Sequence, residues 1–192
     1  MAIFGALSVV LSFIYFPLPP FGDVTPASAP ISIVSTITPA SVGVVASLIK
    51  GVGISLWTGK WFMEIPVGVG DACMAYFTHY LTKNKIKPTH AVIAGQLSRY
   101  LFTSGIVAIY ISIVITSGIA SPLGGDVISK FNKYAGKLGF KPVSHPFLIC
   151  VAIVWLARFP AMTLSILVNA FLSILIIRSL GNQLKRYSQV FH

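Results

Sequence analysis

The chain has very few acidic residues. Only four of its 192 residues are Asp or Glu, against 14 Lys or Arg, and charged residues make up 9% of the sequence. Soluble domains carry about 25% charged residues. So few charges, together with 55% hydrophobic residues and a mean hydropathy of +0.85, exclude an ordinary soluble domain. The composition therefore predicts an integral membrane protein.

The sequence also lacks the common signatures of catalysis and metal binding. The ATP-binding pattern GxxxxGK[ST] and the zinc pattern HExxH are both absent. Four acidic residues leave little material for acid–base pairs or metal ligands. Cys73 and Cys150 lie in apolar runs without CxxC spacing, which favours buried thiols over a disulfide or metal site. We expect no enzyme, no resident cofactor and no metal; an intramembrane lipid-modifying enzyme is an alternative.

Apolar segments punctuated by prolines predict one domain, residues 1–192, that crosses the membrane six times. The first segment ends at Pro17, and the second, followed by Pro39, is too short to span a bilayer alone. We therefore expect an all-α, six-helix transmembrane bundle with a short or broken second helix. The expected helices are 1–16, 31–38, 39–57, 66–81, 90–119 and 160–180.

The segment 120–159 does not fit the simple pattern of spans. The spacing of apolar and basic residues around 130–138 suggests a short amphipathic helix. The apolar stretch 146–180 would be about 50 Å long as one helix, against a hydrocarbon core of about 30 Å. Pro160 predicts a break in this stretch. We therefore expect 146–159 to be an outer extension or a re-entrant piece.

Two groups of basic residues predict the orientation. They are Lys83, Lys85, Lys87, Arg178, Lys185 and Arg186. With six crossings both groups lie on the same side, which is the cytoplasm by the positive-inside rule. We expect a multi-pass protein of the cell membrane with both termini in the cytoplasm. Anionic lipid at the membrane edges, rather than nucleic acid, accounts for the net charge of +10.

Lys50 lies near the middle of the otherwise apolar segment 39–57, and a membrane-buried cation is by default a functional hypothesis. Small residues recur every four positions in this segment, at Gly43, Ser47, Gly51 and Ser55, which predicts a face that packs closely on another helix. Counting along the helices puts Asp71 and Arg99 at a similar depth. Either Asp71 neutralises Lys50 or Arg99 in an internal ion pair, or some of these residues contact a polar ligand.

Trp57, Trp61 and Glu64 form a second candidate group. Two tryptophans four residues apart, with a carboxylate three residues further on, suit a flat organic molecule through stacking and an ion pair. Tryptophans at a helix end are also common interfacial anchors. Asn169, in the apolar last helix, either bonds a neighbouring helix or orients a ligand. The cations favour an anionic ligand and the Trp–Glu group a cationic aromatic one, so the sequence leaves the ligand class open.

Several loose motifs occur in a characteristic order. They are Ala2-xxx-Ala6 in the first helix, the Pro-rich loop 17–30, the Pro39-Ala-Ser-Val-Gly43 turn, the Gly68–Asp71 stretch, Arg99-Tyr100-xxx-Ser104-Gly105 and Asn169. In this order and spacing the chain resembles an S component, the substrate-binding membrane subunit of an energy-coupling factor (ECF) transporter. The motifs from Arg99 onward are similar to those of the thiamine-binding branch.

The resemblance implies high-affinity binding of a vitamin or cofactor precursor by a six-helix subunit. Such a subunit docks on a transmembrane coupling subunit that is driven by two ATPases. By the resemblance, Ala2 and Ala6 form the docking face, and the ligand lies between the outer halves of the later helices and the first loop. The loop 17–30 is a candidate lid. A non-transporting membrane scaffold is the main alternative function.

Overall fold

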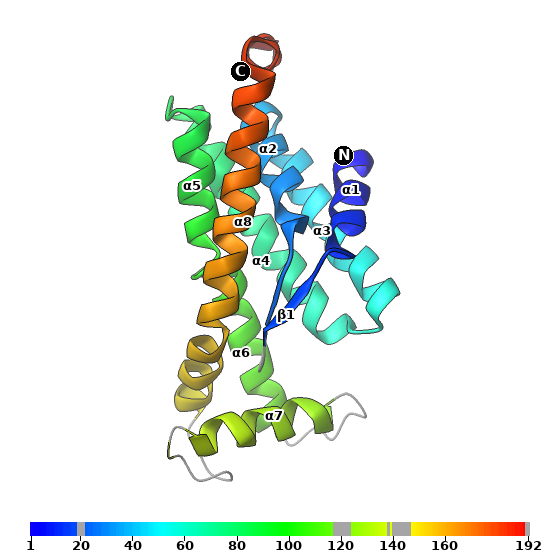
Figure 1. The fold of residues 1–192 in the computed structure, drawn as a ribbon, viewed down its shortest axis with the longest axis vertical. Coiled ribbons are helices and arrows are strands. Elements are labelled where there is room, and N and C mark those ends of the chain that lie inside the picture. The colour runs from blue at the N-terminus through cyan, green and yellow to red at the C-terminus, as the bar shows by residue number, and fades with distance from the viewer. Residues whose placement is uncertain (19–21, 117–123, 138, 140–146, 191–192) are drawn as a thin grey trace.

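A computed structural model of the chain describes residues 1–18, 22–116, 124–137, 139 and 147–190. The described residues form an elongated helical bundle with one small β-hairpin (Figure 1). Three of its helical stretches are long and apolar enough to cross a membrane by length and composition: Ala40–Thr58, Pro88–Thr116 and Phe147–Gly181. The structure is therefore compatible with the expected all-α membrane protein.

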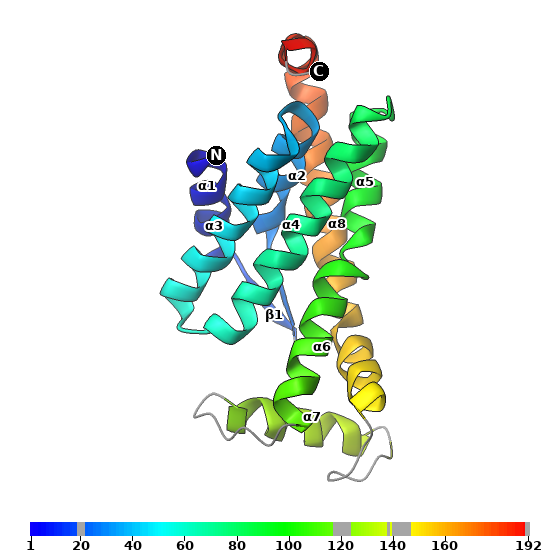
Figure 2. The same ribbon diagram turned by 180° about the vertical axis from the view of Figure 1, so that it is seen from behind.

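The elements in chain order are α1 (Ala2–Ser12), β1 (Phe16–Leu18), β2 (Gly22–Val24), the 3-10 helix η1 (Pro26–Ser28), α2 (Ala29–Ile37), α3 (Ala40–Thr58), α4 (Trp61–Lys83), α5 (Pro88–Ser98), α6 (Phe102–Thr116), α7 (Gly124–Lys137) and α8 (Phe147–Val190). Helices α3 and α4 run in opposite directions along the bundle, α5 and α6 follow one another in the same direction, and α8 returns in the opposite one (Figure 1). Both termini, the α2–α3 turn and the α4–α5 turn lie toward one end. Helix α7 lies across the opposite end, at right angles to the bundle (Figures 1 and 2).

The short helix α2 is the centre of the bundle. Prolines define it: Pro26 and Pro30 occupy the first turns of η1 and α2, where no N–H partner is needed, and Pro39 follows its end. Residues 29–36 are all buried, and α2 packs against α1, α3, α4, α5 and α8. The prediction of a short second helix is confirmed. Its N-terminus consequently lies inside the protein rather than at a surface.

Helices α3 and α4 pack closely through small residues. Gly43, Ser47, Gly51 and Ser55 are all buried, as the four-residue repeat predicts. A Cβ atom added to Gly51 would lie 3.0 Å from the Cα atom of Gly68 in α4. Helix α3 ends at Gly59, whose left-handed backbone (φ 69°) is a common helix C-terminus. This close approach brings Lys50 of α3 alongside α4.

Two predicted helix boundaries were wrong. The expected fifth helix, 90–119, is interrupted at Arg99–Leu101 and forms the separate helices α5 and α6. Conversely, Pro160 does not break the last helix, because α8 continues through it to a change of direction at Gly181 (φ 34°). A proline removes only one backbone hydrogen bond, and packed neighbouring helices tolerate that loss in apolar helices. The expected outer extension 146–159 is thus, from Phe147, the first part of α8.

The Pro-rich loop forms an antiparallel hairpin. Phe16 pairs with Val24 and Leu18 with Gly22, while the hairpin tip, 19–21, lies outside the described residues. Strand β2 packs on α8, and Gly22 lies so close to Ala161 that a side chain there would collide with it. The hairpin points toward the end that carries α7, and its residues are exposed or partly exposed (Figure 1). The predicted amphipathic helix at 130–138 corresponds to α7.

Candidate binding site

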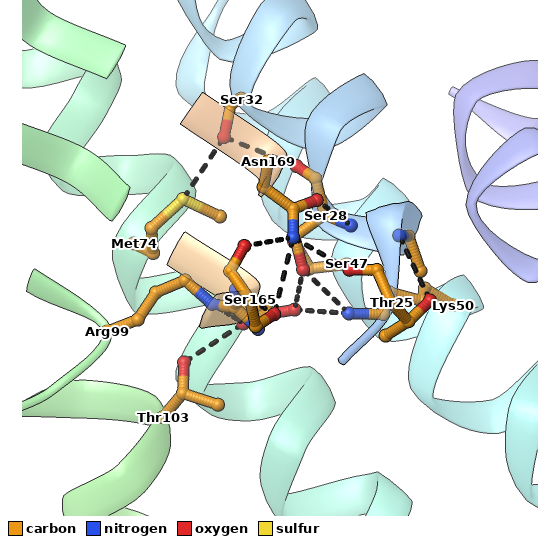
Figure 3. A network of polar contacts seen from close by, with 12 residues as sticks. Thr25, Ser28, Ser32, Ser47, Lys50, Met74, Arg99, Thr103, Ser165 and Asn169 are labelled. Carbon is orange, nitrogen blue, oxygen red and sulfur yellow. Dashed lines mark hydrogen bonds and ion pairs between the residues drawn. The ribbon is translucent and has the colours of Figure 1, made fainter. Parts of the chain in front are cut away.

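The centre of the candidate site is the carboxylate of Asp71 in α4, which is fully buried. Its Oδ1 accepts hydrogen bonds from Arg99 Nε at 3.0 Å and Thr103 Oγ1 at 2.9 Å. Its Oδ2 accepts from Ser28 Oγ at 2.8 Å and from the ammonium group of Lys50. The two ion pairs join α3, α4 and the junction between α5 and α6 (Figure 3). We call Lys50, Asp71 and Arg99 the charged triad.

The charged triad carries a net charge of +1, because two cations share one carboxylate. Lys50 and Arg99 are 2% and 4% exposed. Lys50 Nζ has three N–H groups and two partners among the described residues, Ser28 Oγ at 2.9 Å and Asp71. Arg99 Nη1 reaches Gln96 and Ser165 at 3.4 and 3.3 Å, whereas no described residue accepts a hydrogen bond from its Nη2. Both cations therefore retain unused donors.

Asn169 of α8 holds the N-terminus of α2. Its Oδ1 accepts a hydrogen bond from the Ser28 N–H at 2.9 Å, and its Nδ2 donates to the carbonyl oxygens of Thr25 and Ser165, both at 2.7 Å. A helix start inside the protein needs such partners because its first N–H groups have none within the helix. Of the two roles predicted for Asn169, the structure shows the bond to a neighbouring element.

A second layer of polar contacts lies beside the charged triad. Gln96 Nε2 donates to Ser32 Oγ of α2, and Ser32 Oγ lies 3.5 Å from Met74 Sδ. Gln96 Oε1 in turn accepts from Arg99. These contacts tie α5 to α2 and α4 (Figure 3). The site is therefore one continuous network through the middle of the bundle.

Arg99 lies at the interruption between α5 and α6. The backbone N–H groups of Arg99, Tyr100 and Leu101 bond three residues back, in the tighter 3-10 pattern. The Tyr100 carbonyl accepts from the indole N–H of Trp155 at 2.8 Å, and the Tyr100 hydroxyl bonds Thr163 at 2.6 Å. Helix α8 thus supplies the partners that hold the interruption in place. Interrupted helices are common at ligand sites of membrane transporters.

The structure does not bring the predicted tryptophans into this network. Trp57 is 65% exposed, and its ring meets the edge of Phe13 at a centroid distance of 4.8 Å. Trp61 is 42% exposed at the start of α4. Glu64 lies one turn further, is partly buried, and is close enough to Lys50 and Arg158 to interact with their charges. Glu64 is thus the only member of that group near the charged triad.

Six members of the network were not predicted from the sequence: Ser28, Ser32, Met74, Gln96, Thr103 and Ser165. Gln96 carried a usable signal, since it is an amide in an apolar segment one turn before Arg99. The hydroxyl residues carried no usable signal, because Ser and Thr in membrane helices commonly bond the backbone of their own helix, as Ser47 and Ser55 do here.

Within the described residues, no group of three or more His, Cys, Asp or Glu side chains could hold a metal ion. Comparisons with models of protein families, with curated proteins and with solved structures found no match to this chain. The functional argument therefore rests on the polar network and on the sequence.

Proposed function

We propose that this protein is the substrate-binding membrane subunit of an ECF-type transporter that imports a vitamin or cofactor precursor. In this proposal the chain crosses the cell membrane six times, with α5 and α6 together forming one crossing and both termini in the cytoplasm. It is not an enzyme. A transmembrane coupling subunit and two ATPase subunits supply the energy, since the sequence has no ATP-binding pattern of its own.

The observation that carries the proposal is the net positive charge of the buried charged triad. Burying an ion costs several kcal/mol even after the protein relaxes. A structural role needs only a neutral pair, and Asp71 with Arg99 alone would provide one. The second cation, Lys50, is 2% exposed and exceeds what neutralisation requires. Charged residues inside membrane bundles typically mark substrate pathways, and this surplus supports the same role here.

The first helix supports the docking part of the proposal. Gly5 and Ser8 of α1 are buried, and Gly5 packs on Ile49 and Ala46 of α3. Ala2 and Ala6 lie on the exposed side of α1. Small exposed residues one turn apart let a partner helix approach closely. A partner helix could therefore dock on α1 without disturbing its packing on α3.

The test begins with the purified protein. Mass spectrometry of small molecules released on denaturation, followed by a thermal-shift panel of vitamins, identifies the ligand. A ligand at 100 times its dissociation constant should add about 2.7 kcal/mol of stability. Absence of any released molecule, together with no shift for any cofactor precursor, would reject the proposal in favour of a non-transporting scaffold.

The docking assignment has its own test, which is substitution of Ala2 and Ala6 by Trp. We expect ligand binding to remain and cellular uptake to be lost, because the bulky rings prevent close approach of the coupling subunit. Leu167→Trp is the matched control, since Leu167 is 59% exposed on α8 and away from α1. Loss of binding in the double variant, or loss of uptake in the control, would contradict the assignment.

A further inference from the structure

The charge balance of the network indicates the sign of the ligand. Both oxygens of Asp71 already accept two hydrogen bonds each, so this carboxylate has little capacity left for a ligand. Lys50 and Arg99, in contrast, keep unused N–H groups. Whatever binds here meets hydrogen-bond donors and an excess positive charge. In a buried setting such an excess is costly unless an anion compensates for it.

The other charged groups nearby do not remove the surplus. Glu64 is close enough to Lys50 to interact with it, but it also interacts with Arg158, which is 8% exposed in α8. Lys50 and Arg158 therefore share this one carboxylate. Asp23 of the hairpin, which also interacts with Glu64 and Arg158, is exposed to solvent. Among the described residues, three buried cations (Lys50, Arg99 and Arg158) therefore face two carboxylates that are not exposed, Asp71 and Glu64, which is an excess of one positive charge.

The tryptophans that would stack on a cationic aromatic ligand lie elsewhere. Trp57 is in α3, two helical turns beyond Lys50, or about 10 Å along the axis. Its ring is 65% exposed and already contacts Phe13. No stacking platform therefore faces the charged triad from this position, and of the two ligand classes that the sequence leaves open the charge surplus favours the anionic one.

We propose that the ligand is a small organic acid whose single carboxylate binds the unused N–H groups of Lys50 and Arg99. Charge-assisted hydrogen bonds from ammonium and guanidinium groups to a carboxylate are among the strongest in proteins. Binding offsets the excess positive charge of the described residues. This inference rests on the proposed transport function and names the substrate class of the same site.

The test compares each acid with its own amide on the unmodified protein. Suitable pairs are nicotinic acid and nicotinamide, biotin and biotinamide, and lipoic acid and lipoamide, with thiamine as the cationic probe. We expect at least one acid to bind and to bind at least tenfold more tightly than its amide. Equal affinity within the pairs that bind, or binding of thiamine alone, would overturn the inference while leaving the transport proposal intact. No binding by any vitamin would overturn both.

A matched pair of variants assigns the preference to the charged triad. Lys50→Met removes the surplus charge and leaves Asp71 paired with Arg99, so we expect the acid–amide preference to disappear. Lys60→Met makes the same substitution at an exposed lysine at the start of α4 and should keep the preference. A preference that persists in Lys50→Met would contradict the assignment. If Lys50→Met does not fold, the comparison on the unmodified protein still decides the substrate class.

Discussion

Replacing Asp71 by Asn should destabilise the protein more than any other single loss of charge. The substitution preserves size but leaves Lys50 and Arg99 buried together without a counterion. At the observed 3.0 Å between Arg99 Nε and Asp71 Oδ1, one ion pair corresponds to about 5–6 kcal/mol of Coulomb energy at an effective dielectric constant of about 20. Breaking a buried pair on one side typically costs about 3–5 kcal/mol after relaxation. For a chain of this size that is a fall in melting temperature on the order of 10 °C.

The charged triad also predicts that Lys50→Met changes the stability in opposite directions in the unmodified protein and in the Asp71→Asn variant. Lys50→Met in the unmodified protein leaves a neutral pair and should cost about 1–3 kcal/mol, for the two hydrogen bonds that Lys50 donates to Ser28 and Asp71. In the Asp71→Asn background the same substitution removes one of two repelling cations and should raise the melting temperature. Neighbouring residues show couplings of about 0.5–3 kcal/mol, which this double-mutant cycle can measure.

Thermal unfolding in a fixed detergent, followed by fluorescence or by size-exclusion chromatography, is the assay. Asp23→Asn is the matched control, because it makes the same chemical change at an exposed carboxylate of the hairpin, where solvent screens its interaction with Arg158, and should alter stability by less than about 1 kcal/mol. The reasoning fails if Asp71→Asn behaves like Asp23→Asn. It also fails if Lys50→Met destabilises equally in both backgrounds.

Three further predictions concern packing and the site boundary. Asn169→Leu should cost about 2–4 kcal/mol in thermal unfolding, because it leaves the buried Ser28 N–H and Thr25 carbonyl unpaired; a change below 1 kcal/mol would contradict its clamping role. Gly70→Ala should lower the melting temperature, because its Cβ atom would collide with the Thr103 backbone, whereas Gly105→Ala, with no atom within 4 Å, should not; equal effects would be inconsistent with the packing of α4 on α6. Trp57→Ala should change ligand affinity less than twofold, since its ring lies outside the network, and a tenfold loss in a binding titration would place it in the site.

The sequence predicted the fold best where one physical rule dominated. Prolines at both ends fixed the short α2, and the four-residue repeat of small residues identified the face of α3 that packs on α4. Prediction from the sequence failed where tertiary contacts determine the course of a helix. The interruption at Arg99–Leu101 depends on an indole from α8 that accommodates the Tyr100 carbonyl. Continuity through Pro160 depends likewise on the surroundings of the helix, which hydropathy does not report.

The candidate site, too, was only partly predictable from the sequence. Lys50, Asp71, Arg99 and Asn169 stood out because ionic and amide groups are costly in apolar helices and need a reason to be there. The residues that complete the network mostly carry hydroxyl groups. In membrane helices such groups usually bond the backbone of their own helix, so they do not stand out in the sequence. Apart from the local bond between Ser165 and Asn169, the bonds of these hydroxyl residues to the predicted residues join positions 22 to 141 apart in the chain, so no local pattern could indicate them.

The position of α2 connects the charge of the site to the hairpin. Because α2 is short, its N-terminus and the partial positive charge of its dipole lie inside the bundle beside Asp71. Ser28, at that N-terminus, forms hydrogen bonds with Lys50, Asp71 and Asn169. It lies four residues after β2. An anion that binds the unused N–H group of Lys50 would therefore share that ammonium group with Ser28 and Asp71. Ser28 is thus the residue that connects the charged triad both to the N-terminus of α2 and to the segment that follows the hairpin.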